Sequence, residues 1–307
     1  MAKVAHREQA RKVFHFDNAP LFERLSSEIP YHERYASTDL PVSERKPKRA
    51  LKLCQTCPFN TETLRELSEL VQGDEAWRDW RNCFITSSRF GVAAAEHPQS
   101  WEKAMDFWRE STGRVPAKIF GEVQQGYLGH GKRYEPVARS VYERLTGCGP
   151  LAEEGMRIEM RAPYVYSASP DGVGHDRLIE IKCKAVGRAV SAPPYYYLPQ
   201  IIGAAVIYDK PFSDFVGYWA RPNMEERLMY CARVHTDKKY WKSLRLRLDY
   251  MAWCVVHDVP PTAAILLKTM YPLPEVRIED HFYYYGATAA LDDDPTAALL
   301  DDSNVAQ

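Results

Sequence analysis

The stretch that decides the fold is SPDGVGHDRLIEIKCK, residues 169–184. Its second half alternates apolar and charged residues, a pattern that predicts a β-strand. Successive side chains of a strand point to opposite faces, so Glu180 and Lys182 share one face while Ile179 and Ile181 share the other. We expect the apolar face to be buried in the core.

The turn ahead of this strand brings in a second carboxylate. Pro170-Asp171-Gly172 is a typical turn sequence, and a hairpin here folds Asp171 back towards Glu180. Two nearby carboxylates repel each other unless a cation lies between them, and Mg²⁺ binds well to a few carboxylates, water and a substrate phosphate. Lys182 can orient the attacking water or offset charge on the phosphate. The pattern predicts metal-dependent phosphodiester hydrolysis, in which paired ions lie about 3.5–4 Å apart.

Each half of this pattern also has a simpler explanation. Alternating Glu and Lys on a strand usually form only a solvated outer face. An Asp in a Pro-Asp-Gly turn is usually a turn former. The combination of this turn with this strand favours a catalytic site.

The same residues resemble the PD-(D/E)xK nuclease motif, with Pro170-Asp171 followed by Glu180-Ile181-Lys182. Three further blocks, in order, are similar to the branch that contains phage lambda exonuclease and the YqaJ-type viral recombinases, to which herpesvirus alkaline nucleases are related. The blocks are GDEAW at 73–77 with Arg81 and ITSS at 85–88, GKRYE at 131–135, and YLPQ at 197–200. With the central motif they span about residues 73 to 207.

This resemblance implies an α/β fold with a restriction-endonuclease-like core, in which helices flank a mixed central β-sheet. It implies that Asp171 and Glu180 coordinate Mg²⁺, with Mn²⁺ as a substitute and two ions per site. The backbone carbonyl of Ile181 adds a ligand. Glu135 would reach over the catalytic strands as a further metal-site carboxylate, although a glutamate in the first turn of a helix normally only complements the helix dipole.

The resemblance also implies roles for polar residues around the metal site. Lys182 acts on the attacking water, and Gln200 lies near the lysine and the water, although a polar residue at a helix start needs no such role. Arg81 and Ser88 match the positions that hold the 5′ phosphate of DNA, and Arg89 is an added basic neighbour. Capping of a helix by the Ser/Thr cluster is the simpler explanation for that block.

The implied activity is a Mg²⁺-dependent exonuclease that degrades one strand of duplex DNA from its 5′ end. It would leave 3′ single strands for recombination, repair or viral DNA processing. The implied partners are double-stranded DNA ends and a single-strand-annealing recombination protein. Two alternatives stay open: an endonuclease or RNA-cleaving nuclease of the same fold, and a non-catalytic DNA-binding recombination partner.

The net charge of −1 conceals an uneven distribution. Residues 1–52 carry eleven Lys/Arg and seven Asp/Glu, a net +4, and residues 279–307 carry seven acids and no Lys or Arg, a net −7. The middle region is therefore net +2. Because DNA binding depends on locally placed cations, the overall charge does not exclude DNA as a partner.

The chain divides into three regions by composition. We expect an N-terminal elaboration at 1–60, a nuclease domain at 61–278 and an acidic, flexible tail at 279–307. Within the middle region, apolar spacing predicts helices at 61–72, 132–146, 195–207 and 239–256, and a strand at 215–220. The apolar stripe of the second helix comprises Val137, Val141 and Leu145, and Val71 belongs to the apolar face of the first. The buried face of the fourth helix comprises Trp241, Leu244, Leu248 and Met251.

No apolar run approaches the roughly 20 residues that a membrane-spanning helix needs. The start of the chain does not resemble a secretory signal, so we expect an intracellular protein, cytoplasmic or nuclear, without a membrane partner.

Seven irregularly spaced cysteines favour reduced thiols. Cys54 and Cys57 have half the spacing of a zinc or iron–sulfur site but no matching pair. The basic run at 45–49 is typical of an import signal or a DNA contact, but more often is only solvated.

Overall fold

A computed structural model describes residues 19–27, 38–45, 61–116, 121–159, 164–185, 192–220, 226–261, 268 and 272–287. Cys54, Cys57, the basic run beyond Arg45 and the part of the expected acidic tail beyond Ala287 lie outside these ranges. The expected flexibility is wrong for residues 279–287, which belong to a β-strand paired in the larger sheet. Within them, no helix combines the length and the apolar character needed to cross a bilayer. The described cysteines are free thiols, as expected.

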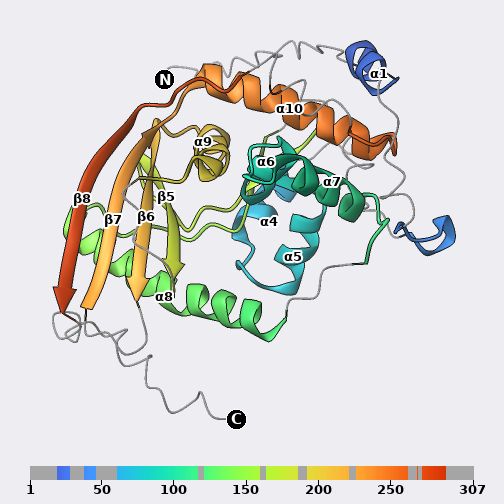
Figure 1. Cartoon of the computed structure of the whole chain (residues 1–307). Helices are drawn as coiled ribbons and strands as arrows, with labels where there is room; N and C mark the ends of the chain where they lie inside the picture. Colours follow the sequence, from blue (N-terminus) through green and yellow to red (C-terminus); the bar gives the residue numbers. More distant parts are fainter. Residues whose placement is uncertain are drawn as a thin grey trace, which may run out of the picture.

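The described residues form two β-sheets, and the larger has five strands in the order β4-β5-β6-β7-β8 (Figure 1). The pair β5 and β6 is parallel, and the other pairs are antiparallel, so the expected mixed sheet is confirmed. The strands are β4 (Gly172–Val173), β5 (Arg177–Lys184), β6 (Phe212–Ala220), β7 (Glu226–His235) and β8 (Ile278–Ala287).

The expected hairpin is formed by β4 and β5. Gly172 pairs with Ile179, and Val173 pairs with Leu178. A Cβ atom at position 172 would lie 2.8 Å from Cγ1 of Ile179, so only glycine fits there without a shift. Asp171 directly precedes β4, and residues 174–176 connect β4 to β5.

Two helices cover opposite faces of β5. Helix α8 (Glu122–Thr146) packs on the face of Ile179 and Ile181, which are buried as expected. Helix α9 (Leu198–Ile207) follows a 3₁₀ turn, η2 (Tyr195–Tyr197), and packs on the face of Leu178. Glu180 is only 3% exposed, so its face of the strand is not the solvated surface that the simpler explanation requires.

A second layer of helices lies beyond α9. Helix α10 (Lys238–Val256) packs against α9, α6 and α7, and in Figure 1 it runs along the top of the view while α8 runs along the bottom. The expected buried face of α10 is confirmed for its four predicted residues, Trp241, Leu244, Leu248 and Met251. The other helical elements that the structure describes are α1 (Ala19–Ser27), η1 (Val42–Glu44), α4 (Thr61–Glu69), α5 (Glu75–Asn82), α6 (Ser87–Ala93) and α7 (Ser100–Ser111).

A small three-stranded sheet connects these helices to the hairpin. Its order is β1-β3-β2, with β1 (Ile85–Thr86) parallel to β3 (Tyr166–Ala168) and β2 (Arg157–Glu159) antiparallel to β3. Strand β3 ends three residues before Asp171. Helix α5 precedes β1 and helix α6 follows it. Because β1 runs parallel to β3, with Thr86 paired to Ser167, the start of α6 lies at the end of β3 that leads to Asp171.

Helix α8 differs from its prediction. It begins at Glu122, ten residues before the expected start at 132, and it contains Gly126, Gly129 and Gly131. Glycine is unfavourable inside a helix, which is why the sequence predicted a later start. Glu135 is consequently in the middle of α8 and not in its first turn.

Two apolar side chains were also placed wrongly by the sequence. Leu145, expected in the buried stripe of α8, is 41% exposed. Val71, expected on the buried face of a helix reaching residue 72, is 62% exposed because α4 ends at Glu69. Both lie at helix ends, where the periodic pattern extends beyond the packed contact.

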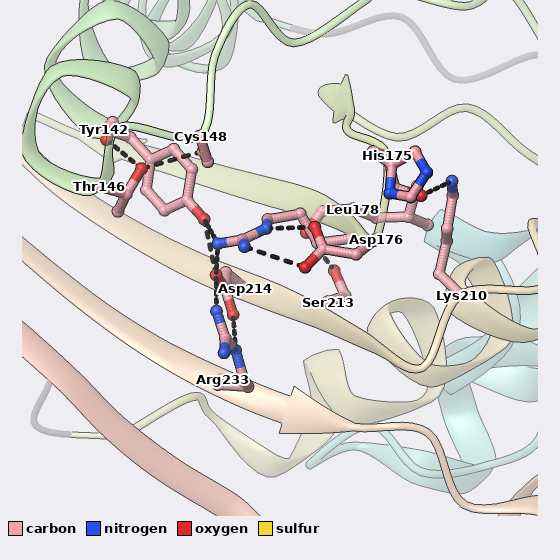
Figure 2. A network of polar contacts seen from close by, with 11 residues as sticks. Tyr142, Thr146, Cys148, His175, Asp176, Leu178, Lys210, Ser213, Asp214 and Arg233 are labelled. Atoms are coloured by element: carbon pink, nitrogen blue, oxygen red, sulfur yellow. Dashed lines mark hydrogen bonds and ion pairs between the residues drawn. The ribbon is translucent and has the colours of Figure 1, made fainter.

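A buried polar network fastens α8 to the larger sheet (Figure 2). Asp214 on β6 is fully buried and accepts a hydrogen bond of 2.6 Å from the hydroxyl of Tyr142 on α8. Arg233 on β7 donates to both of its carboxylate oxygens, at 2.9 and 3.0 Å, and Arg177 Nη1 lies 3.6 Å from Oδ2. Glu135 is seven residues before Tyr142 and so shares its side of α8.

Candidate active site

The turn before β4 places the carboxylate of Asp171 against the backbone of β5. Its Oδ2 accepts a hydrogen bond of 2.6 Å from the backbone N–H of Ile181. The turn is held from outside by Gln72, whose Nε2 donates to the carbonyls of Pro170 and Glu154 at 3.0 and 2.9 Å. Asp171 is therefore fixed beside the strand that carries the other predicted catalytic residues.

A second set of contacts anchors the chain just before this turn. Ser169 Oγ donates to the carbonyl of Gly155 at 2.6 Å, and Trp77 Nε1 donates to the same carbonyl at 3.0 Å. A Cβ atom on Gly155 would lie 2.3 Å from the carbonyl oxygen of Leu70. Only glycine allows this approach between the loop and α4.

Glu180 is the centre of the polar contacts on β5. Its Oε1 accepts from Lys182 Nζ in an ion pair and from Gln200 Nε2 at 2.5 Å. Glu180 and Lys182 share one strand face, as their spacing predicts, and Gln200 comes from the first turn of α9. Three predicted catalytic residues thus meet at one carboxylate oxygen.

Glu135 joins the site from α8. Its Oε1 lies 3.5 Å from Nη2 of Arg139, one turn further along the helix, and the same nitrogen lies 2.5 Å from Oε1 of Glu153. Burial, then the charge of Asp171, raises the pKa of Glu135 to about 8, and Glu180 raises it further while Arg139 opposes the shift. The charges of Asp171 and Glu180 therefore both act on Glu135.

The acids and the lysine perturb one another strongly. Burial followed by the charge of Asp171 raises the pKa of Glu180 to about 7, and burial raises the pKa of Asp171. Burial alone lowers the pKa of Lys182, but Glu180 and Asp171 outweigh it, so the net shift is upwards. Lys182 stays protonated, and the three acids hold protons more tightly than free carboxyls do.

The donor chemistry of the site fits a hard divalent cation, because carboxylate oxygens are the ligands that Mg²⁺ prefers. Burial is the first cause of the raised pKa of each of these carboxyls, and the positive charge of Lys182 opposes the rise at all three. Among the residues that the structure describes, no three His, Cys, Asp or Glu side chains lie close enough together to hold one ion. Glu180 is engaged by Lys182 and Gln200, and Asp171 by the N–H of Ile181. Metal coordination by Asp171, Glu180, Glu135 and the Ile181 carbonyl stays a prediction.

Arg81 and Ser88 lie together where α5 ends and α6 begins. Arg81 Nη2 donates to Ser88 Oγ, and its guanidinium lies 4.6 Å from the ring centre of Trp77. The N-cap residue of α6, Thr86, makes no side-chain capping hydrogen bond; its hydroxyl lies 3.1 Å from Ser88 Oγ. The simple capping explanation for this block is wrong for these side chains.

The charges of Glu180 and Asp171, the two predicted catalytic acids of the strand and turn, also act on Arg81. Burial lowers its pKa, whereas the charges of Glu180 and Asp171 raise it. The fork of an arginine suits bidentate contact with phosphate oxygens. Contact of the Arg81–Ser88 pair with a phosphate beside these acids stays a prediction.

Arg89 is directed elsewhere. Its Nη2 lies 2.7 Å from Oε2 of Glu110 on α7, and its guanidinium lies 5.0 Å from the ring centre of Phe107. Its charge still reaches Arg81, whose pKa it lowers. Of the three residues predicted to contact nucleic acid, Arg89 is the one that pairs with an acid of the neighbouring helix.

Residues 76–210 match the family model of the YqaJ-like viral recombinase domain. Over these 135 of 307 residues the chain is similar to that domain. This match confirms the resemblance inferred from the sequence blocks, and it contains every predicted site residue. It does not test the proposed boundaries at 61 and 278.

Solved structures show weaker similarity to the chain. An alkaline exonuclease, LHK-Exo, from Laribacter hongkongensis is 22% identical, with a TM-score of 0.45, over 64% of this chain and 97% of its own. LHK-Exo in complex with dAMP is 21% identical, with a TM-score of 0.44, over the same shares. SSO0001 is 10% identical, with a TM-score of 0.33, over 68% and 91%. None of the curated proteins matches the chain significantly.

Sequence reasoning missed several residues that shape the candidate site. Arg139 could have been found, because it follows Glu135 by four residues on a predicted helix and such pairs are neighbours. Gln72 gave no signal, since its contact with Pro170 spans 98 positions. The same holds for Glu153, which meets Arg139 from a loop.

Proposed function

We propose that this chain is a metal-dependent nuclease that hydrolyses phosphodiester bonds of DNA. One observation carries the proposal: Asp171, Glu180 and Lys182 lie in one mutually perturbed cluster, with Arg81 in the same field. Acids alone would suit many sites. Acids together with a charged lysine and an arginine that can bind phosphate oxygens suit a phosphodiester substrate. The match to the model of a viral recombinase family supports the same conclusion.

Each residue has a role in this proposal. Asp171, Glu180, Glu135 and the carbonyl of Ile181 would hold Mg²⁺, or Mn²⁺ in its place, and two such ions would supply Lewis-acid activation of the phosphate and of a water. Lys182 offsets negative charge that develops on the phosphate. Gln200 keeps the carboxylate of Glu180 in position through its 2.5 Å hydrogen bond.

The proposed mode is exonucleolytic, from the 5′ end of duplex DNA. The Arg81–Ser88 pair supports this mode, because a pocket for a terminal phosphate favours strand ends over continuous duplex. Digestion of one strand would leave a 3′ single strand for recombination, repair or viral DNA processing. Such a strand is the substrate that a single-strand-annealing recombination protein would take up.

Two substitutions test the chemistry. With Mg²⁺ and a linear duplex, Asp171→Asn and Lys182→Ala should each lower the cleavage rate about 100- to 1,000-fold, the usual cost of losing one electrostatic stabiliser. Asp176→Asn is the matched control, since this acid lies in the same hairpin, is 48% exposed and pairs only with Arg177 among the ion pairs described. Unchanged cleavage by both site variants would indicate a contaminating nuclease and favour a non-catalytic DNA-binding protein.

The choice of substrate tests the mode. We expect degradation of 5′-phosphorylated linear duplex, with no cutting of closed circular DNA and no cleavage of RNA. Efficient cutting of the circle would show an endonuclease, and cleavage of RNA alone would show a ribonuclease of the same fold.

A further inference from the structure

Three consecutive tyrosines form a row of rings next to Lys182, and the chemistry proposed above uses none of them. Lys182 Nζ lies 5.3 Å from the ring centre of Tyr197. The ring centre of Tyr196 is 4.6 Å from that of Tyr197, and that of Tyr195 is 5.6 Å from that of Tyr196. Tyr195 is 53% exposed, so the row leads from the lysine to the surface.

The inner end of this row is fixed by packing. Tyr197 stacks on the buried Phe215, with ring centres 6.0 Å apart and an interplanar angle of 28°. The carbonyl of Tyr196 lies so close to Gly91 of α6 that a Cβ atom there would be 2.8 Å from it. The row is therefore held between α6, which carries Ser88, and β6, while Tyr195 remains open.

A single exposed tyrosine needs no explanation, because apolar atoms form much of any protein surface. Here the exposed ring continues a row that ends at a charged lysine, and Arg81 lies in the field of the same acids. Proteins that bind single-stranded nucleic acid combine cations for the backbone with aromatic rings on which bases stack. The side chains around Lys182 provide both.

We propose that Tyr195 and Tyr196 form a stacking subsite for bases of the DNA strand that is cleaved at Lys182. This inference rests on the proposed nuclease function and adds a contact to it. The rings of Tyr195 and Tyr196 meet at 82° with their centres 5.6 Å apart, so no base fits between them, and the exposed ring of Tyr195 offers the face on which a base stacks. Stacking serves every base equally, which suits an enzyme that digests a strand of any sequence.

Steady-state kinetics of the full chain on 5′-phosphorylated linear duplex with Mg²⁺ test the subsite. Tyr195→Ala should raise KM at least about fivefold and leave kcat unchanged, because base–aromatic stacking of about 1 kcal/mol or more is lost. Tyr195→Phe keeps the ring and should keep the wild-type KM. Tyr283→Ala is the matched control: Tyr283 is 56% exposed on β8, with β6 and β7 between it and β5, and its loss should change nothing.

Substrates with one abasic nucleotide, scanned through the first four positions from the 5′ end, identify the ligand. At one position the difference in KM between wild type and Tyr195→Ala should disappear, because no base is left to stack. Equal KM values for wild type and Tyr195→Ala on intact DNA would overturn the subsite, as would a Tyr195→Phe variant as weak as Tyr195→Ala or a difference that survives at every abasic position. Failure of the wild-type protein to cleave DNA would instead overturn the proposed function.

Discussion

Gln200 Nε2 lies 2.5 Å from Glu180 Oε1, so the first turn of α9 is joined to β5 at the carboxylate that also pairs with Lys182. The amide donates and the carboxylate accepts. Both Gln200 and Lys182 contact Oε1 of Glu180, and neither contacts Oε2. Polar groups that orient a ligand in this way are typically worth a factor of about 10 to 100 in activity or metal affinity.

Removal of that amide should therefore impair catalysis and not folding. We expect Gln200→Ala to lower kcat about 10- to 100-fold, with Gln200→Glu at least as damaging because it adds a fourth acid. Thermal denaturation should show a folded protein in both cases. A Gln200→Ala variant with wild-type kcat would contradict the role of the amide.

The raised pKa values predict how stability depends on pH without divalent ions. Glu135 and Glu180 have pKa values raised from 4.5 to about 8 and about 7, so the folded protein binds protons more tightly than the unfolded chain. Their protonation stabilises the fold at low pH, and this contribution is lost as pH rises from about 5 to 8. Tm in the presence of a chelator should fall over that range. Glu135→Gln and Glu180→Gln should flatten the fall, and a rise in Tm would contradict the prediction.

Cation binding should show the opposite pH dependence. Ligand carboxylates must lose their protons before they bind a metal, so Mg²⁺ or Mn²⁺ should bind more tightly as pH rises from 6 to 9, with protons released. Calorimetry in buffers of different ionisation enthalpy measures that release. Asp171→Asn should abolish binding, whereas Asp176→Asn should not. Equal binding at all pH values would argue against the three acids as ligands.

Loss of the Arg81 guanidinium should remove the preference for a phosphorylated end. On wild-type protein we expect 5′-phosphate duplex to be degraded about 10- to 100-fold faster than 5′-hydroxyl duplex, in line with the 1.5–3 kcal/mol of a charged hydrogen bond. Arg81→Ala should degrade both at the slower rate. Arg78→Ala is the control on the same helix, since Arg78 Nε bonds the carbonyl of Gly73 at 2.7 Å. An unchanged preference in Arg81→Ala would place the phosphate elsewhere.

The buried network around Asp214 should matter for stability. Asp214→Ala leaves Arg233, Arg177 and the hydroxyl of Tyr142 without their common acceptor. Breaking a buried ion pair costs about 3–5 kcal/mol, and partial exposure of both arginines should hold the loss near the lower end. Urea denaturation measures it, with Asp176→Ala expected to cost less than about 1 kcal/mol.

Local patterns in the sequence were sufficient for the hairpin and for the main helices. Alternation at 178–183 identified β5 and its two faces, and the apolar spacing of Trp241, Leu244, Leu248 and Met251 identified the buried face of α10. The start of α8 was not predictable in this way. Its glycines carry a local cost in a helix, and the local rule gave the wrong boundary.

The candidate site was predictable only as far as its residues lie on motifs. Family resemblance pointed to Glu135, 36 positions before Asp171, and the structure places the two within one electrostatic field. The contacts that hold the site were beyond reach, because Gln72 meets Pro170 and Tyr142 meets Asp214 only after the chain has folded. The local sequence around these residues does not indicate which distant residues they contact.

The alternation on β5 also protects the protein against misalignment. The strand is bonded on both edges, to β4 and β6, and helices cover both of its faces. A slip of one position would turn Glu180 and Lys182 into the apolar contact with α8 and expose Ile179 and Ile181 to the polar side. The charged pair that we assign to catalysis thus makes the shifted sheet energetically unacceptable, so one pair of side chains selects the correct alignment during folding and serves the reaction afterwards.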